Sequence, residues 1–400
     1  METSRNPYSP GAGAPPPELA GREGVLESAG NAIVRAKAGR APKALMVLGL
    51  RGVGKTVLLN EFEKIAEANG SQTALVEAVA NQSLAEMLTP QLQRILLKLN
   101  RLQRVGHELQ RAFGLLRSFA SVFKVRVGEL EFGASNEPVT GDLSLDLTDL
   151  FVAIGEAAKA RNTVIAILID EVQYLTQEDL SALIVALHKI SQRRLPLVFF
   201  GAGLPQLAKL AGDAKSYAER LFEYPPIGPL DSESARRALV EPARSEGAEF
   251  SDDALEHILE QTRGYPFFLQ VWGAHAWDAA KLTPINAADA KAATTRAIAG
   301  LDEGIFKSRF ERMTERQRQY ARAMAEFGAG PANSTAVAEL LGMNVKQAGP
   351  VRDELIKKGM AYSPNRGDVA FTIPLFDEFM RRRMAGPGKG PRAARKVGGN

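Results

Sequence analysis

The chain has 400 residues, of which 45% are hydrophobic and 24% are charged, so it is long enough to bury the cores of two or three domains. It contains no cysteine, which excludes disulfides and thiolate metal sites, and its four histidines do not have the spacing of metal ligands. The formal net charge is +4, but residues 381–400 hold seven basic and no acidic side chains, which leaves 4 − 7 = −3 for the rest. The total charge therefore does not indicate a basic domain surface, although the tail alone could attract nucleic acid or an anionic membrane non-specifically.

The two ends of the chain are expected to lie outside its folded domains. Residues 1–20 are rich in Pro, Gly and Ala, which predicts a flexible arm that crosses the surface in an extended form. Residues 386–400 are expected to form a disordered basic tail. The N-terminus lacks the apolar run of a signal peptide, and no stretch of about 18 uninterrupted apolar residues could span a bilayer. We therefore expect a cytoplasmic protein without membrane segments.

Short apolar segments over residues 21–230 predict an α/β core. Four of them are continuously apolar and alternate with helical stretches, a pattern typical of a parallel sheet covered by helices on both faces. The last segment contains prolines, which cannot donate hydrogen bonds inside a sheet, so we expect it at an edge. The segments are 44–50, 73–79, 163–170, 195–203 and 223–230.

The core contains an insertion over residues 91–150. Its first part, 91–127, predicts one or two amphipathic helices and carries eight basic residues against one acid, Glu108. Its second part, 128–150, has six acids and no base. The alternation in KVRVGELEF and LSLDL suggests a β-hairpin. Both a pair of solvated, mutually attracting faces and a surface for nucleic acid or a protein partner fit this pattern.

A glycine-rich segment, GLRGVGKT at residues 49–56, follows the first apolar segment and precedes a helical pattern. This is the context of a phosphate-binding loop, in which successive backbone N–H groups and a helix N-terminus point at an anion. Lys55 would neutralise β- and γ-phosphate oxygens, and Thr56 would offer its hydroxyl to Mg²⁺. The residues predicted to bind ATP here are Gly49, Leu50, Arg51, Gly52, Val53, Gly54, Lys55, Thr56 and Val57.

Two acids, Asp170 and Glu171, end the apolar segment 163–170. The carboxyl ends of strands are where open α/β sheets bind ligands. We expect Asp170 to orient Mg²⁺ through its water shell and Glu171 to align the water that attacks the γ-phosphate. A strand that ends in a solvated acidic turn is the structural alternative. Together with Lys55, the pair predicts ATP hydrolysis.

The pattern becomes wholly helical over residues 231–301, where four short helices predict a small lid. Residues 302–385 predict three helices, a β-hairpin in MAYSPNRGDVAFTIP and a final helix, which is the element order of a winged-helix domain. Gly349 and Pro350 are expected to break or reset the third helix.

This order of strand, phosphate loop, Asp-Glu strand, lid and C-terminal module resembles AAA+ and STAND-type P-loop ATPases, in particular origin-recognition (replication-initiator) and archaeal-type ATPases. The resemblance spans roughly residues 20–385. It implies that Arg22, in a Gly-Arg-Glu entry segment, lies near the adenine, and that Pro266 belongs to a Gly-x-Pro lid motif. It also implies that Arg220 is an arginine finger reaching the γ-phosphate of a neighbouring subunit in a homo-oligomer. An ordinary exposed helix residue is the alternative for Arg220.

Two departures from AAA+ proteins favour slow turnover. Gly201, Ala202 and Gly203 stand where a polar sensor residue is usual, and the lid motif lacks the sensor arginine of AAA+ initiators. Phosphate binding and transition-state stabilisation are separable contributions. A slow switch controlled by ATP and ADP therefore fits better than a fast motor.

The C-terminal module leaves two partners open. If it binds DNA, the third helix would enter the major groove with Lys346, Gln347 and Arg352, and Arg366 at the wing tip would approach the backbone or minor groove. Winged helices also bind proteins. The sequence thus predicts a DNA-associated ATPase switch, and the alternative is a STAND-like signalling switch whose winged helix and basic insertion hold a protein partner.

Overall fold

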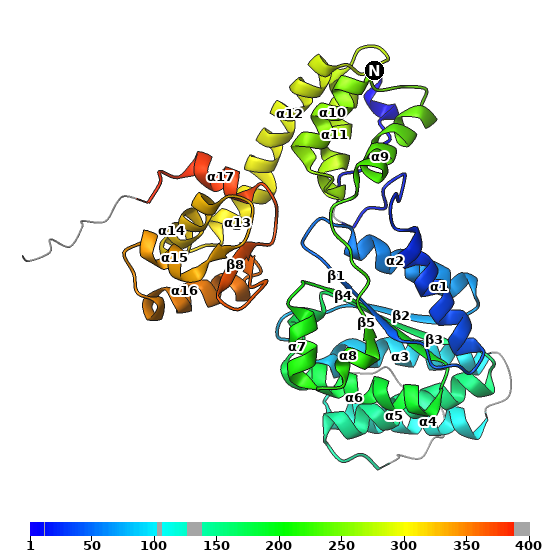
Figure 1. Ribbon diagram of the computed structural model, residues 1–400. Coiled ribbons are helices and arrows are strands. Elements are labelled where there is room, and N and C mark those ends of the chain that lie inside the picture. Colours follow the sequence, from blue (N-terminus) through cyan, green and yellow to red (C-terminus); the bar gives the residue numbers. More distant parts are fainter. Residues whose placement is uncertain (12, 102–105, 126–137, 388–400) are drawn as a thin grey trace, which may run out of the picture.

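The computed structural model describes residues 1–400 except 12, 102–105, 126–137 and 388–400. Figure 1 shows a sheet domain, a lid of helices and a C-terminal part beside them. We use these names for residues 21–230, 231–301 and 302–385, the ranges expected from the sequence. Within the described residues, none of the helices combines the length and the apolar character needed to cross a bilayer.

The sheet has five parallel strands in the order β2-β3-β4-β1-β5, which confirms the predicted parallel sheet. The last strand is short and lies at the edge beside β1, as the prolines after it predict. Since β1 and β3 are interior and run the same way, their carboxyl ends meet at one edge of the sheet. The strands are β1 (Ala44–Leu48), β2 (Gln72–Glu77), β3 (Ile165–Asp170), β4 (Leu197–Gly203) and β5 (Phe222–Glu223).

Helices cover both faces of the sheet, and alternate residues of each strand enter separate cores. Leu45 and Val47 of β1 join the core beneath α1 and α2, whereas Ala44 and Met46 join the core on the other face. Figure 1 shows α1 and α2 above the strands and α4, α5 and α6 below them. The helices are α1 (Glu23–Lys37), α2 (Lys55–Ala68), α3 (Leu84–Arg101), α4 (His107–Val122), α5 (Leu143–Ala160), α6 (Gln177–Arg193), α7 (Leu207–Ala214) and α8 (Ala218–Leu221).

The prediction of one or two helices in the first part of the insertion is confirmed by α3 and α4, but the hairpin interpretation of LSLDL is wrong. These residues begin α5, because the Asp142 side chain accepts a hydrogen bond from Leu145 N at 3.0 Å and caps the helix. Buried leucines at 143, 147 and 150 follow a helical rather than an alternating period. The other proposed strand, KVRVGELEF, lies largely outside the described residues.

The four predicted lid helices are all present and surround two buried tryptophans. Trp272 Nε1 donates to Thr294 Oγ1 at 2.9 Å, which joins α11 to α12. The turn before α11 is tight: Gly264 has φ +70°, and a Cβ on it would lie 2.4 Å from the Leu230 carbonyl oxygen. The lid helices are α9 (Ser232–Ser245), α10 (Asp252–Thr262), α11 (Pro266–Ala279) and α12 (Ala287–Leu301).

The N-terminal arm lies along the lid and then reaches the sheet domain. Its short helix η1 (Thr3–Arg5) is followed by Tyr8, whose ring is buried and whose hydroxyl donates to the Leu239 carbonyl. Gly273 of α11 makes room for this ring, since a Cβ there would lie 2.7 Å from it. Trp277 Nε1 donates to the Glu2 carbonyl at 3.0 Å. The arm that the sequence predicts as flexible therefore has specific contacts with the lid.

The chain stays helical from α12 through a π-helical segment, η3 (Asp302–Phe306), into α13 (Lys307–Glu311). The rest of the C-terminal part consists of four α-helices, one 3-10 helix and a three-stranded antiparallel sheet of order β6-β8-β7, and it contains the predicted hairpin, β7-β8. Its elements are α14 (Glu315–Met324), η4 (Ala325–Phe327), β6 (Ala332–Asn333), α15 (Ser334–Leu340), α16 (Val345–Lys357), β7 (Ala361–Tyr362), β8 (Asp368–Phe371) and α17 (Phe376–Arg383).

The expected break of the third helix is wrong, because α16 continues through Pro350. A proline at this position removes the bond that its N–H would make to the carbonyl of Lys346. Both residues are exposed, so water can hydrate that carbonyl. A capping box between Asn344 and Gln347 and the buried Leu355 hold the helix at its two ends.

The contacts of Tyr8 predict that the arm stabilises the lid. We expect Tyr8→Ala to lower the free energy of unfolding of the lid by about 3 kcal/mol, because it leaves a cavity where an aromatic ring was buried. Tyr8→Phe, the matched control, loses only one hydrogen bond and should cost about 1 kcal/mol. Both tryptophans of the chain lie in α11, so tryptophan fluorescence during urea unfolding reports on the lid. An unchanged midpoint for Tyr8→Ala would contradict this role of the arm.

Candidate functional site

The predicted phosphate loop connects β1 to α2. Gly52 and Gly54 have φ values of +86° and +93°, which glycine adopts without steric cost. Among the described residues, no backbone acceptor pairs with the N–H groups of residues 52–54, and α2 begins directly after them. Such a row of free donors before a helix N-terminus is suited to an anion.

Lys55 and Thr56, the first residues of α2, place a cation and a hydroxyl beside this loop. Lys55 Nζ donates to the carbonyls of Gly49 and Leu50, at 3.1 Å each. Burial lowers the pKa of Lys55, and the charges of Glu171 and Asp170 oppose this effect. Among the described residues, the Lys55 ammonium thus has two backbone oxygens of the loop as its hydrogen-bond partners.

Asp170, the last residue of β3, meets Thr56 across the sheet edge. Thr56 Oγ1 donates to Asp170 Oδ2 at 2.5 Å. Burial raises the pKa of Asp170, and the hydrogen bonds from Thr56 and from Glu171 N lower it. A hydroxyl and a carboxylate in contact fit a magnesium ion that takes its other ligands from phosphate and water. Within the described residues, no group of three or more His, Cys, Asp or Glu could hold a metal by itself.

Glu171 follows in a left-handed backbone conformation, with φ +52°, and both of its carboxylate oxygens are engaged. Arg51 Nη1 lies 3.4 Å from Oε1, and the Gln173 side-chain amide donates to Oε2. The other end of the Gln173 amide accepts from Leu204 N at 3.0 Å. Gln173, in η2 (Val172–Tyr174), thus links Glu171 to the end of β4.

The structure gives a reason for glycine at position 203. A Cβ there would lie 2.7 Å from Gln173 Oε1, so the Gln173 side chain occupies the space that a side chain at 203 would need. A polar group is therefore present at the end of β4, but it comes from another element. The sequence analysis missed it, because Gln173 and residue 203 are neighbours only in the folded sheet.

Arg22 and the lid both bind the backbone of the phosphate loop. Arg22 is buried, and its guanidinium donates to the carbonyls of Val53 at 3.3 Å and Gly228 at 2.5 Å. Burial lowers the pKa of Arg22. From the lid, Phe267 N donates to the Gly52 carbonyl at 3.1 Å. The lid motif that contains Pro266 thus contacts the loop directly.

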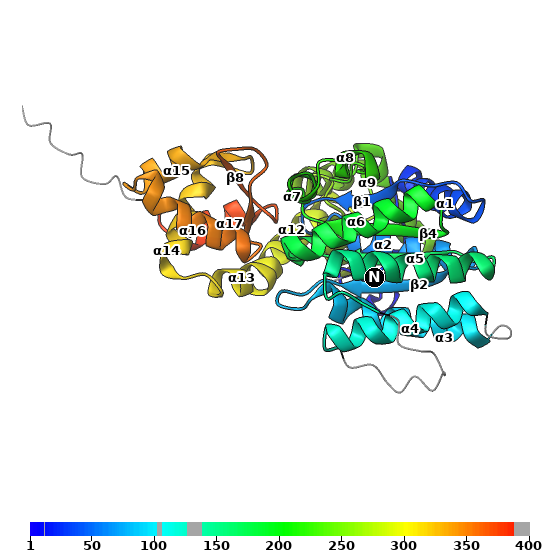
Figure 2. The ribbon, with the colours of Figure 1, turned by 90° about the horizontal axis from the view of Figure 1, so that it is seen from below.

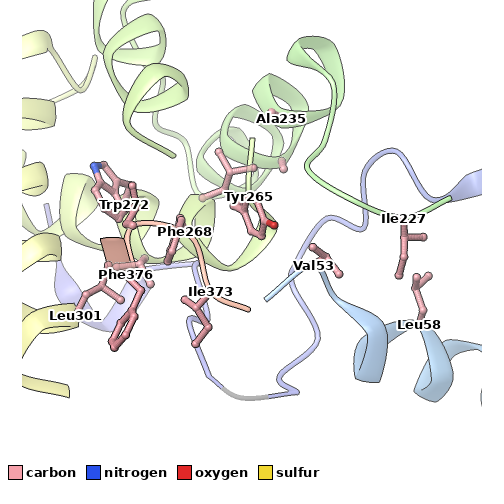
Figure 3. Close-up of a cluster of buried hydrophobic side chains, with 14 of the residues drawn as sticks. Val53, Leu58, Ile227, Ala235, Tyr265, Phe268, Trp272, Leu301, Ile373 and Phe376 are labelled. Carbon is pink, nitrogen blue, oxygen red and sulfur yellow. The ribbon is translucent and has the colours of Figure 1, made fainter. Parts of the chain in front are cut away.

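The C-terminal part contacts the same loop from another side. Arg51 N donates to the carbonyl of Thr372 in the C-terminal part at 3.0 Å. The Arg51 side chain stays within the sheet domain, where Nη2 donates to Tyr174 Oη at 3.1 Å. Figure 3 shows Val53 of the loop near Tyr265 and Phe268 of the lid and Ile373 of the C-terminal part. The loop is therefore hydrogen-bonded to both other parts of the chain.

A cavity of about 340 Å³ lies over the loop and is lined by the arm, the sheet domain, the lid and the C-terminal part. Glu171 and all the predicted nucleotide-binding residues except Gly49 and Leu50 line it. Sequence reasoning missed the arm residues near Ser9 and three residues of the C-terminal part. The latter are Ile305, Arg309 and Ile373. No local pattern marks them, since they reach the cavity only through the packing of distant segments.

The remaining predicted residues lie elsewhere. Arg220 is exposed in α8 just before β5, which runs parallel to β1, so it lies toward the sheet edge opposite the phosphate loop. Lys346 and Arg366 are exposed. Gln347 is engaged in the cap of α16, and Arg352 pairs with Asp353 at 2.9 Å.

Two family models match the chain. Residues 18–200 match the AAA ATPase domain, and residues 303–380 match a domain of unknown function. No curated protein sequence matches the chain significantly.

Several solved structures are similar to this chain. The Walker-type ATPase PABY2304 of Pyrococcus abyssi is 16% identical, with a TM-score of 0.58 over 92% of this chain and 98% of that chain. The Aeropyrum pernix ORC1 protein in complex with DNA is 14% identical, with a TM-score of 0.45 over 92% and 94% of the two chains. The Thermotoga maritima RuvB Holliday junction branch migration motor is 17% identical, with a TM-score of 0.41 over 88% and 92%. The first of these likenesses supports the parallel-sheet P-loop fold.

Proposed function

We propose that this chain binds ATP with Mg²⁺ on the loop at residues 49–56, hydrolyses it slowly, and acts as a nucleotide-controlled switch. One observation carries the proposal: the loop that would hold the phosphates is hydrogen-bonded to the lid through Gly52 and to the C-terminal part through Arg51. A change in the loop on binding or loss of phosphate would therefore alter both contacts. The match of residues 18–200 to the AAA ATPase domain supports the nucleotide.

Each residue has a separate part in this chemistry. The backbone N–H groups of the loop and Lys55 would bind phosphate oxygens, and Thr56 with Asp170 would hold Mg²⁺. The ion would supply positive charge to the phosphate oxygens. Glu171 would orient the attacking water and accept its proton. Arg51 and Gln173 engage one site on each Glu171 oxygen and compete with water for this carboxylate, which favours slow turnover.

We expect Glu171→Gln to retain ATP and to lower the hydrolysis rate by about 100-fold, because an amide cannot accept the proton. Lys55→Ala, the companion variant, should lose nucleotide binding itself, since it removes the buried cation at the loop. Binding of a fluorescent ATP analogue and release of phosphate, measured on the same samples, separate the two effects. Hydrolysis at the wild-type rate by the Glu171 variant would refute its role.

We further propose that residues 302–385 form a winged-helix domain that associates with DNA. Three helices followed by the hairpin β7-β8 support this assignment. Of the four candidate contacts, Lys346 at the start of α16 and Arg366 in the hairpin turn have exposed side chains without a protein partner among the described residues. They are the residues best placed to reach phosphates.

A protein partner is the alternative, and two observations favour it. Gln347 and Arg352 are engaged within the domain, which leaves few side chains for reading bases. In addition, Arg94 and Lys98 of the insertion are exposed on α3, so a basic surface exists outside the C-terminal part. A STAND-like signalling switch would use these surfaces for a protein.

Titration of a labelled duplex at several salt concentrations tests the DNA proposal. We expect affinity to fall with salt, and the double variant Lys346→Gln, Arg366→Gln to reduce the slope of log affinity against log salt by about 2, one for each lost phosphate contact. Arg236→Gln, which removes a half-exposed arginine that pairs with Asp252 within the lid, should leave the slope unchanged. No binding with ATP, with ADP or without nucleotide would contradict the proposal. A defined protein that co-purifies despite nuclease, and is lost with Lys55→Ala, would support the alternative.

We also propose that Arg220 acts on the nucleotide of a neighbouring subunit. Its place toward the sheet edge opposite the loop supports a role in trans rather than within its own chain. The proposal requires that the chain form a homo-oligomer.

We expect Arg220→Ala and Lys55→Ala to be inactive alone, each losing about tenfold or more of the hydrolysis rate. A mixture of the two should regain part of the rate, because a subunit with Lys55 can then receive Arg220 from its neighbour. Phosphate release by the mixture, beside light scattering for the oligomer, measures this. A mixture as inactive as its components, or a monomer with every nucleotide, would exclude the role.

A further inference from the structure

Arg309 brings a second arginine to the end of the nucleotide cavity where Glu171 lies. It belongs to α13, directly after the π-helical segment, and lines the cavity together with Arg51, Lys55 and Glu171. Arg309 Nη1 donates to the Gly359 carbonyl at 3.2 Å and lies 3.5 Å from Met360 Sδ. These contacts hold the Nη1 end of the guanidinium, and neither partner is acidic.

The surroundings of Arg309 are unfavourable for a cation. Among the described residues, no carboxylate lies within ion-pair distance of its guanidinium, since Glu171 pairs with Arg51 instead. Burial, together with the charges of Arg51 and Arg312, lowers the pKa of Arg309 to about 10, and the nearby Tyr174 and Glu171 oppose this shift only in part. A partly buried cation beside another cation is costly unless an anion compensates it. A negatively charged ligand in the cavity next to Arg309 would therefore be stabilised.

The phosphate chain of a nucleotide is the anion that suits this cavity, because the phosphate loop lines it. Phosphates on the loop would run past Lys55 and Thr56 toward Asp170 and Glu171. The phosphate nearest Glu171 is the terminal one, because this carboxylate has to hold the attacking water. A planar guanidinium can give two parallel hydrogen bonds to such a group.

We propose that Arg309 binds the terminal phosphate of ATP within its own chain and thereby makes the docking of the C-terminal part depend on that phosphate. This inference rests on the proposed nucleotide binding. With ATP, the phosphate lies between Arg51 and Arg309 and joins the two parts of the chain. With ADP, the two arginines face each other without it, and docking is weaker. By reciprocity, whatever holds the C-terminal part in place raises the affinity for ATP relative to ADP.

The test compares two nucleotides in variants of one helix. Arg309→Gln should weaken binding of the β,γ-imido analogue of ATP by about 10-fold to 100-fold, the range for loss of a charged hydrogen-bond donor, and should change ADP affinity less than about threefold. Arg312→Gln removes an exposed arginine three residues along that does not line the cavity and should leave both affinities unchanged. Arg309→Lys, which keeps the charge but loses the planar fork, should lie between.

A second readout separates phosphate binding from a merely structural role. The ATP analogue should protect the segment around η3 from protease better than ADP does in the wild type, and this difference should vanish in Arg309→Gln. An equal loss of affinity for both nucleotides, or no loss for either, would overturn the inference while the proposed function stands. A wild-type chain that binds neither nucleotide would overturn both.

Discussion

The hydrogen bonding of the phosphate loop is the constraint on which the rest of the structure depends. Its glycines at positions 52 and 54 have positive φ values, so the backbone can turn tightly there. The lid donates a hydrogen bond to the Gly52 carbonyl, and Arg22 donates one to the Val53 carbonyl. The C-terminal part accepts a hydrogen bond from Arg51 N. A segment with buried polar backbone has few alternative conformations. The position of the loop and the docking of both other parts are therefore mutually dependent.

The sheet domain could be predicted from the sequence, because its signals are local. Apolar runs located the first four strands, and the context of residues 49–56 located the phosphate loop. The fifth strand, expected over 223–230, is only Phe222–Glu223. Two predictions from the sequence pattern were wrong. The alternating segment LSLDL is helical because Asp142 caps the helix. Helix α16 continues through Pro350 because the proline lies on an exposed face. In both cases one side chain or its exposure to water decides the outcome, and periodicity alone does not report it.

The far wall of the site could not be predicted in the same way. Arg309 and Ile373 reach the cavity from the C-terminal part, and Ser9 reaches it from the arm. Such contacts depend on the angle between packed parts, which no spacing in the sequence encodes. Gln173 is an intermediate case, since glycine at position 203 shows that a polar side chain is missing there but not which residue replaces it.

The unbroken helical path from α12 through η3 to α13 has a mechanical consequence. At about 1.5 Å per residue, the 25 residues from Ala287 to Glu311 form a rod of roughly 37 Å, and Figure 2 shows it running from the lid to the C-terminal part. A rod turns small rotations at one end into larger translations at the other. Its π-helical turn is its least regular point, so bending would concentrate at η3, next to Arg309. Bending at η3 would thus change the angle between the lid and the C-terminal part at a point beside the cavity over the phosphate loop.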